Sequence, residues 1–282
     1  MRYPPDNKTV LTLKSKGNQC SIGRKYEGAG YLPPHSQEIL YIGMAVLKVE
    51  KDQQENVLNI KSLGSSNGPV REGLEAANNF FQKFDPSLMT FGSSVMPTFI
   101  RQCLFHGVSC KTILRTGNRY ESPPHRFFDR YHTDISKTIT NNDPSEQVPL
   151  NEVAEECGLP GRMAVDDSQV DVMYTERRLR EIRSACEIDV ALTTGILLKV
   201  EHLQGNLTGN GFLLSARTFL DFLEEQSKQR PHFREFLNNT DFKKFLNASP
   251  SLEEGEASHS VRSRGNENQD KPLVKLRLVE DR

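Results

Sequence analysis

The clearest pattern in this chain is a long run of apolar positions at helical spacing near residue 190. No proline interrupts the run, whose inward positions are Ile182, Ala185, Cys186, Val190, Leu192, Thr193, Ile196, Leu197 and Val200. This spacing predicts a long helix that packs through one face. A shorter helix, a turn with glycine and proline at 158–161 and a charged connector precede it. Residues 149–208 are therefore the centre of the predicted organisation.

Strand patterns and helix patterns alternate in the first half of the chain. Alternating or continuous apolar residues predict strands at 9–14, 39–49, 56–63, 88–91 and 131–135. Helical spacing predicts helices at 70–84 and 96–105, and the many Gly and Pro residues in 15–37 and 108–126 predict loops. This order predicts an α/β fold with a mixed sheet flanked by helices, the arrangement of ribonuclease-H-like proteins.

The C-terminal part is predicted to be helical up to residue 247. Two amphipathic patterns, at 213–229 and 232–247, place Phe and Leu residues on the inward faces. Residues 249–271 have almost no apolar side chains and are expected to be disordered. Residues 272–282 alternate again, which fits an edge strand, a segment that contacts a protein partner, or a frayed end. The expected division is a domain at 1–248 and a polar tail at 249–282.

Composition excludes some classes of protein and leaves others open. The 282 residues are 36% hydrophobic and 8% aromatic, which is enough for a packed core. Because 36 Lys and Arg balance 37 Asp and Glu, a nucleic-acid partner would need a local basic patch. The five scattered cysteines lack a C-x-x-C pair and are expected to be reduced thiols. Without a signal-peptide core or a membrane-spanning run, a cytoplasmic location is expected.

Several short motifs stand out because of the order in which they follow one another. They are Leu88–Gly92 with Pro97 and His106-Gly107, the segment Arg130–Ile135, the pair Pro149-Leu150 with Ala154, the turn Gly158–Gly161 with Val170, and the set Cys186, Asp189, Val190 and Thr193. Together they resemble the predicted 3'-5' exonucleases related to the proofreading domain of family-B DNA polymerases. The resemblance extends over roughly residues 9–246 and implies a ribonuclease-H-like fold.

The same resemblance indicates where the metal ligands of such an enzyme would lie. The family binds two cations of the magnesium or manganese type through an Asp-x-Glu on the first strand and an aspartate in each of two later motifs. The corresponding residues here are Thr12, Lys14, Val95 and Asp189, and Ala185 stands where the family has a tyrosine that orients water. Because only Asp189 is a carboxylate, no metal cofactor is expected and catalysis is expected to be impaired.

Two further hypotheses concern charged residues at this centre. Glu50 and Asp52 follow the predicted strand 39–49 and could replace the missing Asp-x-Glu, which keeps a Mg- or Mn-dependent exonuclease as the alternative. If Lys14 lies beside Asp189, its ammonium takes the place of the metal and joins the strand to the helix. A separation beyond ion-pair distance excludes this second hypothesis.

The remaining charged residues indicate binding more than catalysis. Arg177, Arg178, Arg180 and Arg183 form the best local candidate for contacts with phosphates, although such a run is usually a solvated helix face. His132 and Asp134 are expected to be structural. The resulting prediction is a catalytically impaired exonuclease-like protein that binds single-stranded DNA or RNA or acts as a scaffold. The alternatives are an active exonuclease and a protein-interaction module without nucleic-acid contact.

Overall fold

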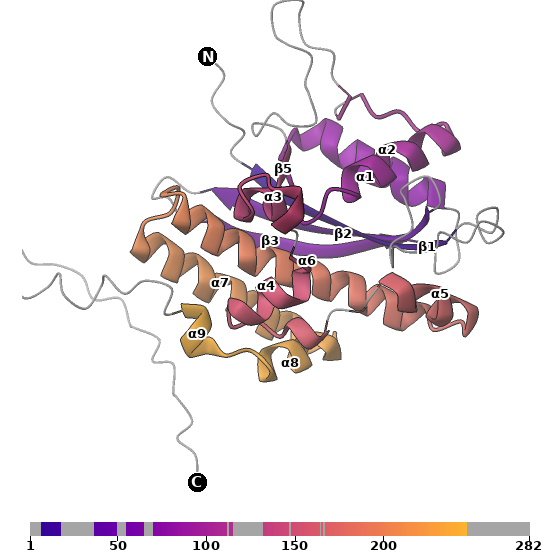
Figure 1. Ribbon diagram of the computed structural model, residues 1–282. Coiled ribbons are helices and arrows are strands. Elements are labelled where there is room, and N and C mark those ends of the chain that lie inside the picture. Colours follow the sequence, from indigo (N-terminus) through magenta and orange to yellow (C-terminus); the bar gives the residue numbers. More distant parts are fainter. Residues whose placement is uncertain are drawn as a thin grey trace, which may run out of the picture. The chain divides into compact units, whose positions relative to one another are not determined.

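A mixed β-sheet forms the centre of the fold (Figure 1). The computed structural model describes residues 7–17, 37–49, 55–64, 70–111, 113–114, 132–146, 148–163, 165 and 167–246. The described strands are β1 (Asn7–Gly17), β2 (Gln37–Val49), β3 (Glu55–Gly64), β4 (Ser87–Thr90) and β5 (His132–Asp134). Their order is β3-β2-β1-β4-β5; β1 pairs antiparallel with β2 and parallel with β4. The strand that carries the first motif is therefore the central one.

Helices cover both faces of the sheet (Figure 1). α1 (Val70–Phe84) and α2 (Val95–His106) lie on one face, and α6 (Leu179–Leu203) and α7 (Gly209–Ser227) lie on the other. The shorter described elements are α3 (Ile135–Ile139), η3 (Pro144–Glu146), α4 (Leu150–Glu156), η4 (Gly161–Met163), α5 (Asp167–Thr175), α8 (Pro231–Asn238) and α9 (Phe242–Leu246). The predicted ribonuclease-H-like α/β arrangement with a helical C-terminal part is confirmed.

Strand β1 distributes its side chains to the two faces by simple alternation. Leu11 and Leu13 belong to the hydrophobic cluster on the side of α1 and α2. Val10 belongs to the cluster formed with α6 and α7, and the side chains of Thr12 and Lys14 contact residues of α6. The two polar residues of the first motif are thus aimed at the same helix.

Several elements differ from the predicted ones for local reasons. The long predicted helix is confirmed as α6, but α3 and α5 were not predicted. α3 has only five residues, and it begins after Asp134, whose carboxylate accepts a hydrogen bond from the backbone N–H of Ser136 at 3.2 Å. α5 lies in the segment that was predicted to be a charged connector without regular structure. Val170 and Met173 nevertheless pack inward there at helical spacing.

The single helix predicted at 232–247 is wrong. The chain forms α8 and α9 instead, because Asp241 leaves the helical path: its backbone N–H donates to the carbonyl of Gly158 at 2.8 Å. The carboxylate of Asp241 then accepts from the backbone N–H of Lys244 at 3.0 Å, as an N-cap does. The partner that breaks the helix comes from a distant turn.

Some predictions fall outside the described residues. They concern most of the loop 15–37, the pair Glu50 and Asp52, the domain boundary at 248 and the tail 249–282. Within the described part of the chain, no helix has both the length and the apolar character that crossing a bilayer requires.

Lys8, near the start of β1, contacts two buried carboxylates. Its ammonium forms ion pairs with Glu55 and, at 2.6 Å, with Glu201. The backbone N–H of Glu55 donates to the hydroxyl of Ser215 at 2.7 Å, which fixes the start of β3 against α7. One cation therefore serves two buried acids, and one negative charge is left without full compensation.

Replacing Glu55 by Gln is expected to raise the free energy of unfolding at neutral pH by about 1 kcal/mol, because it removes one of the two buried negative charges that share the single ammonium of Lys8. Burial and the charge of Glu201 raise the pKa of Glu55, although Lys8 opposes the shift. The protonated carboxyl therefore stabilises the fold below the ordinary pKa of 4.5, and this stability is lost as the pH rises through the raised pKa.

Urea unfolding of both proteins across this pH range measures the effect. The advantage of Glu55→Gln should grow as the pH rises above the ordinary glutamate value, because only the natural chain then acquires the buried charge. A difference that stays constant with pH would contradict this account of Glu55.

Candidate functional site

Lys14 and Asp189 form a buried ion pair between the sheet and α6. Nζ of Lys14 lies 2.8 Å from Oδ2 of Asp189, and the two side chains are 3% and 10% exposed. The same ammonium donates a hydrogen bond to the carbonyl of Val165 at 2.8 Å. The predicted ion pair is therefore confirmed, and it joins β1, α6 and the segment that precedes α5.

Close packing surrounds this pair on the sheet. The hydroxyl of Thr12 donates to the backbone carbonyl of Cys186 at 3.4 Å. Gly43 pairs with Thr12 across the sheet, and a Cβ there would lie 2.4 Å from the side chain of Val190 and 3.0 Å from the same carbonyl. Burial, then the charge of Asp189, raises the pKa of Cys186 to about 12, so this thiol stays protonated at neutral pH. Helix α6 therefore rests directly on β1 and β2.

Val95 and Ala185 lie on opposite faces of the sheet. Val95 is the first residue of α2 and packs, half-buried, against the hydrophobic cluster on the opposite face of the sheet from α6. Ala185 lies on α6 and is buried, one turn before Asp189. The structure thus brings Thr12, Lys14 and Asp189 to one face, whereas Val95 belongs to the packing of the other.

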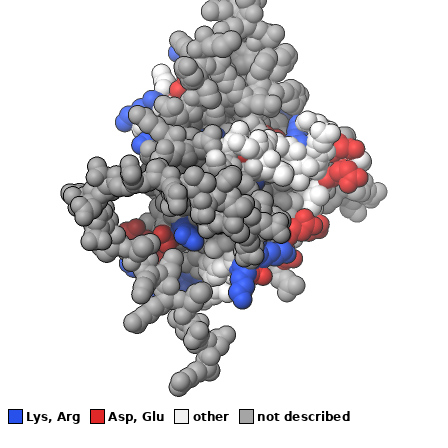
Figure 2. Space-filling model, turned by 90° about the vertical axis from the view of Figure 1, so that its left-hand side faces the viewer, with Lys and Arg blue, Asp and Glu red and all other residues white. Residues whose placement is uncertain are grey.

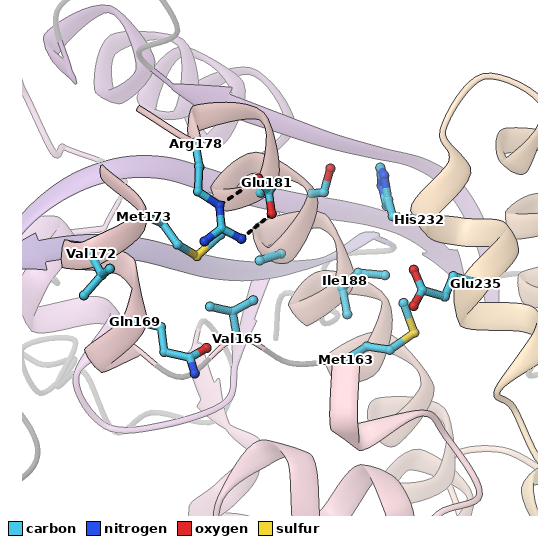
Figure 3. A pocket seen from close by; sticks show the side chains of 12 residues that line it. Met163, Val165, Gln169, Val172, Met173, Arg178, Glu181, Ile188, His232 and Glu235 are labelled. Atoms are coloured by element: carbon cyan, nitrogen blue, oxygen red, sulfur yellow. Dashed lines mark hydrogen bonds and ion pairs between the residues drawn. The ribbon is translucent and has the colours of Figure 1, made fainter. Parts of the chain in front are cut away.

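A groove of about 590 Å³ lies beside this centre, between η4, α5, α6 and α8 (Figure 3). Ala185 lines it, so the small side chain at the position of the family's tyrosine leaves space there. Val165, whose carbonyl binds Lys14, lines it too. Its charged lining consists of Arg178, Glu181, Glu235 and His232. With two carboxylates and one guanidinium, the groove itself is not basic.

The four predicted arginines do not share one helix face. Arg177 has a positive φ of 60° and lies with Arg178 in the turn before α6, so only Arg180 and Arg183 belong to that helix. The guanidinium of Arg178 contacts Glu181 at 2.6 Å and Glu176 at 3.1 Å. Because Arg178 is occupied by these two carboxylates, the group of four arginines is weaker as a phosphate-binding patch than the sequence suggested. Figure 2 shows a different face, the left-hand side of Figure 1, where basic and acidic side chains occur in small neighbouring groups.

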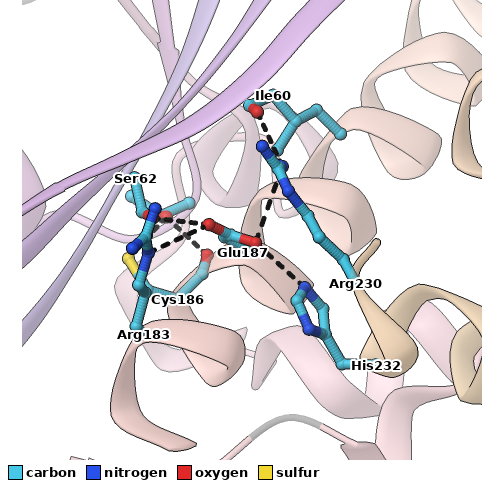
Figure 4. Close-up of polar contacts among 8 residues, drawn as sticks. Ile60, Ser62, Arg183, Cys186, Glu187, Arg230 and His232 are labelled. Atoms are coloured by element: carbon cyan, nitrogen blue, oxygen red, sulfur yellow. Dashed lines mark hydrogen bonds and ion pairs between the residues drawn. The ribbon is translucent and has the colours of Figure 1, made fainter. Parts of the chain in front are cut away.

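A second polar centre, around Glu187, was missed in the sequence (Figure 4). This buried carboxylate lies 2.9 Å from Nε2 of His232, 3.6 Å from Arg230 and 3.4 Å from Arg183. It also accepts a hydrogen bond from the hydroxyl of Ser62 at 2.5 Å. Burial raises the pKa of Glu187, but the bonds from His232 and Ser62 and the charge of Arg230 outweigh it, so the pKa is lowered.

This cluster joins the edge strand β3 to α6 and α8. Arg230 also donates to the carbonyl of Ile60 at 2.9 Å, and Arg183 donates to the hydroxyl of Ser62 at 2.8 Å. The spacing of Arg183 and Glu187, four residues apart on a helix, is a local signal that could have been read. No local signal identifies Arg230 or His232 as partners. The cluster places the half-buried Arg230 on the same carboxylate as the exposed Arg183.

His132 and Asp134 have structural contacts, in line with the prediction. Nε2 of His132 lies 3.0 Å from the hydroxyl of Thr90, which joins β5 to β4. The carboxylate of Asp134 accepts from the backbone N–H of Gly92 at 3.0 Å and from the hydroxyl of Ser136 at 2.8 Å. These bonds hold the β4–α2 loop against the start of α3.

The donors at the Lys14 centre do not fit a divalent cation. Thr12 offers one neutral hydroxyl that is already bonded, Lys14 is itself cationic, and Val95 has no oxygen in its side chain. Magnesium and manganese need several converging oxygens, and carboxylates provide their charge. Among the residues that the structure describes, no three His, Cys, Asp or Glu side chains gather as metal ligands. The contacts that these residues do make hold α6 against β1.

The family relationship rests on most of the chain. Residues 29–240 match the sequence model of a family described as predicted 3'-5' exonuclease related to the exonuclease domain of PolB. Strand β1, with Thr12 and Lys14, precedes the matched residues, and the sheet places it between β2 and β4. No curated protein matches the chain. Because the match spans well over half of the 282 residues, the chain belongs to this family of predicted 3'-5' exonucleases related to the exonuclease domain of PolB.

Proposed function

We propose that this protein is a non-cleaving member of its exonuclease-like family that binds single-stranded nucleic acid. The observation that carries the proposal is the ammonium of Lys14, 2.8 Å from Asp189 and 2.8 Å from the carbonyl of Val165. A fixed internal cation neutralises the carboxylate that a family enzyme uses for its metal. Cleavage by two metals needs a site that binds them and activates water.

The absence of cleavage follows from charge and coordination. A metal at Asp189 would have to displace the ammonium of Lys14, whose side chain is 3% exposed and hydrogen-bonded. The displaced ammonium would then lie beside a divalent cation, which costs further electrostatic energy. Thr12 cannot compensate, since it adds no negative charge. A protein can keep the fold of a nuclease without keeping its catalytic chemistry.

Binding is supported by exposed cations near the start of α6. Arg177, Arg180 and Arg183 are exposed, and the half-buried Arg230 shares the carboxylate of Glu187 with Arg183. Tyr174, 40% exposed, lies one turn before Arg177. Guanidinium groups beside an aromatic face suit a single strand, because phosphates contact the cations and bases stack on the ring.

The test uses the whole chain with labelled single-stranded DNA and RNA. Strand length is followed on denaturing gels with manganese, with magnesium and with chelator, and binding is followed by fluorescence anisotropy at several salt concentrations. Arg177→Ala/Arg180→Ala is compared with Arg71→Ala/Arg101→Ala, which removes the same charge from the exposed surface of α1 and α2. We expect the protein to bind the labelled strands without shortening them.

We also expect the first pair of substitutions to reduce the slope of log K against log salt by about 1.4, or about 0.7 for each lost phosphate contact, and the second pair to leave it unchanged. Metal-dependent shortening that Asp189→Ala abolishes would show an active exonuclease and overturn the proposal. Absence of any binding would overturn its nucleic-acid part and favour a protein-interaction module.

A further inference from the structure

The groove between η4, α5, α6 and α8 has an apolar floor. Met173 of α5 and Ala185 and Ile188 of α6 line it, and they are 6%, 4% and 2% exposed. Met163 of η4 lines the side away from Met173 (Figure 3). Thioether side chains adapt to the shape of an apolar ligand. With a volume of about 590 Å³, the groove falls within the usual range of sites that hold a small ligand.

One side of the groove carries a flat pair of side chains, Arg178 and Glu181. Nε of Arg178 donates to Oε1 of Glu181 at 2.8 Å, and Nη2 donates to Oε2 at 2.6 Å. Such a bidentate pair fixes the guanidinium in the plane of the carboxylate. Both side chains line the groove. A fixed guanidinium plane is a surface on which a nucleobase stacks.

The charges of the groove disfavour a phosphate and accept an uncharged group. Glu176 also contacts Arg178, at 3.1 Å, so two carboxylates share this one guanidinium. The exposed Glu235 adds a further carboxylate to the lining. A phosphate that entered would be repelled by this negative charge, whereas a base carries no net charge at neutral pH.

The cations that suit phosphates lie outside the groove. Arg177 and Arg180 are exposed and do not line it. They immediately precede Arg178 and Glu181 in the chain, so they flank the flat pair. A bound strand can therefore place its phosphates on these two arginines and turn a base toward the groove.

We propose that the groove receives one base of a bound single strand. The inference rests on the proposed function and names the part of the ligand that enters this site. The base stacks on the plane of Arg178 and Glu181, and three side chains of the lining can form hydrogen bonds with its edge: Gln169, Ser184 and Glu235. A base that is paired inside a duplex cannot enter, so the groove selects single strands.

The test compares a labelled strand of deoxycytidines with a strand of the same length built from tetrahydrofuran abasic residues. Cytosine is chosen because its amino group can donate to a carboxylate such as that of Glu235. Fluorescence anisotropy with the whole natural chain should show about tenfold weaker binding of the abasic strand, the loss of one stacked base. The slope of log K against log salt should be the same for both strands, because their phosphates are the same.

Two variants show whether this difference arises in the groove. Arg178→Lys keeps the positive charge but removes the plane and the bidentate pair, and its side chain is 44% exposed, so the fold should be little affected. Ser184→Phe fills the groove without changing charge. Each should weaken binding of the deoxycytidine strand toward that of the abasic strand and leave the abasic strand unaffected. Arg71→Lys alters an exposed Arg–Glu pair on α1 and should change neither.

The outcomes separate this inference from the function on which it rests. Equally tight, salt-dependent binding of both strands would overturn the base site and leave nucleic-acid binding intact. A difference between the strands that both groove variants preserve would also overturn it, because the base would then be held elsewhere, as on Tyr174. If neither strand is bound, the proposed function and this inference fall together.

Discussion

Replacing Lys14 by Met is expected to lower the free energy of unfolding by about 3–5 kcal/mol, the cost of removing one partner of a buried ion pair. The substitution leaves the carboxylate of Asp189 in a site that is 10% exposed and closed by β1 and α6. It also leaves the carbonyl of Val165 without the ammonium that binds it at 2.8 Å. Urea unfolding followed by circular dichroism measures the loss.

The decisive comparison is a double-mutant cycle. Lys14→Met/Asp189→Leu should recover most of the loss, because an apolar pair of similar volume often replaces a buried ion pair at little cost. Arg71→Met is the matched control: its ion pair with Glu75 is 57% and 45% exposed, so its loss should cost about 0.5 kcal/mol or less. If Lys14→Met costs no more than this control, the ion pair does not hold α6 to the sheet.

Gly158→Ala is expected to destabilise the protein by about 3 kcal/mol or more, from two separate causes. The residue has a φ of +81°, which a side chain disfavours. In addition, its Cβ would lie 2.7 Å from the backbone nitrogen of Phe245 and 2.9 Å from the carbonyl oxygen of Asp241. Backbone atoms cannot rotate away, so α9 would have to move from the turn.

Gly205→Ala separates the two causes. Gly205 has a φ of +78°, but a Cβ there would meet no atom within 4 Å among the described residues. This variant should therefore show only the conformational cost, about 1 kcal/mol. The difference between the two variants in the unfolding midpoint in urea measures the packing of α9 on the turn. Equal losses would mean that this packing contributes nothing to stability.

The periodicity of apolar residues was sufficient to predict most strands and helices, because burial repeats every two residues in a strand and about every 3.6 residues in a helix. It located the three antiparallel strands, α1, α2 and α6. It failed where few residues carry the pattern, as in α3, and where a distant group intervenes. The carbonyl of Gly158 separates α8 from α9, and nothing in residues 232–247 indicates that contact.

The centre at Lys14 was predictable because two local rules combine there. Residues two apart on a strand share a face, as Thr12 and Lys14 do, and residues three apart on a helix share a face, as Cys186 and Asp189 do. The family motifs indicated that the first strand faces the long helix, and this arrangement places Lys14 beside Asp189. The same motifs gave Val95 a place in the site, whereas its side chain packs against the other hydrophobic cluster.

The remaining polar centres depend on which distant segments lie together in the fold. The spacing of residues within one strand or helix contains no information about such contacts. Glu187 contacts His232 on α8, and Lys8 contacts Glu201 on α6. Each is a group whose burial requires a partner, and the partner is supplied by whatever element packs over it. The pattern of apolar residues thus determines most of the strands and helices, while tertiary packing determines which charged side chains pair between them.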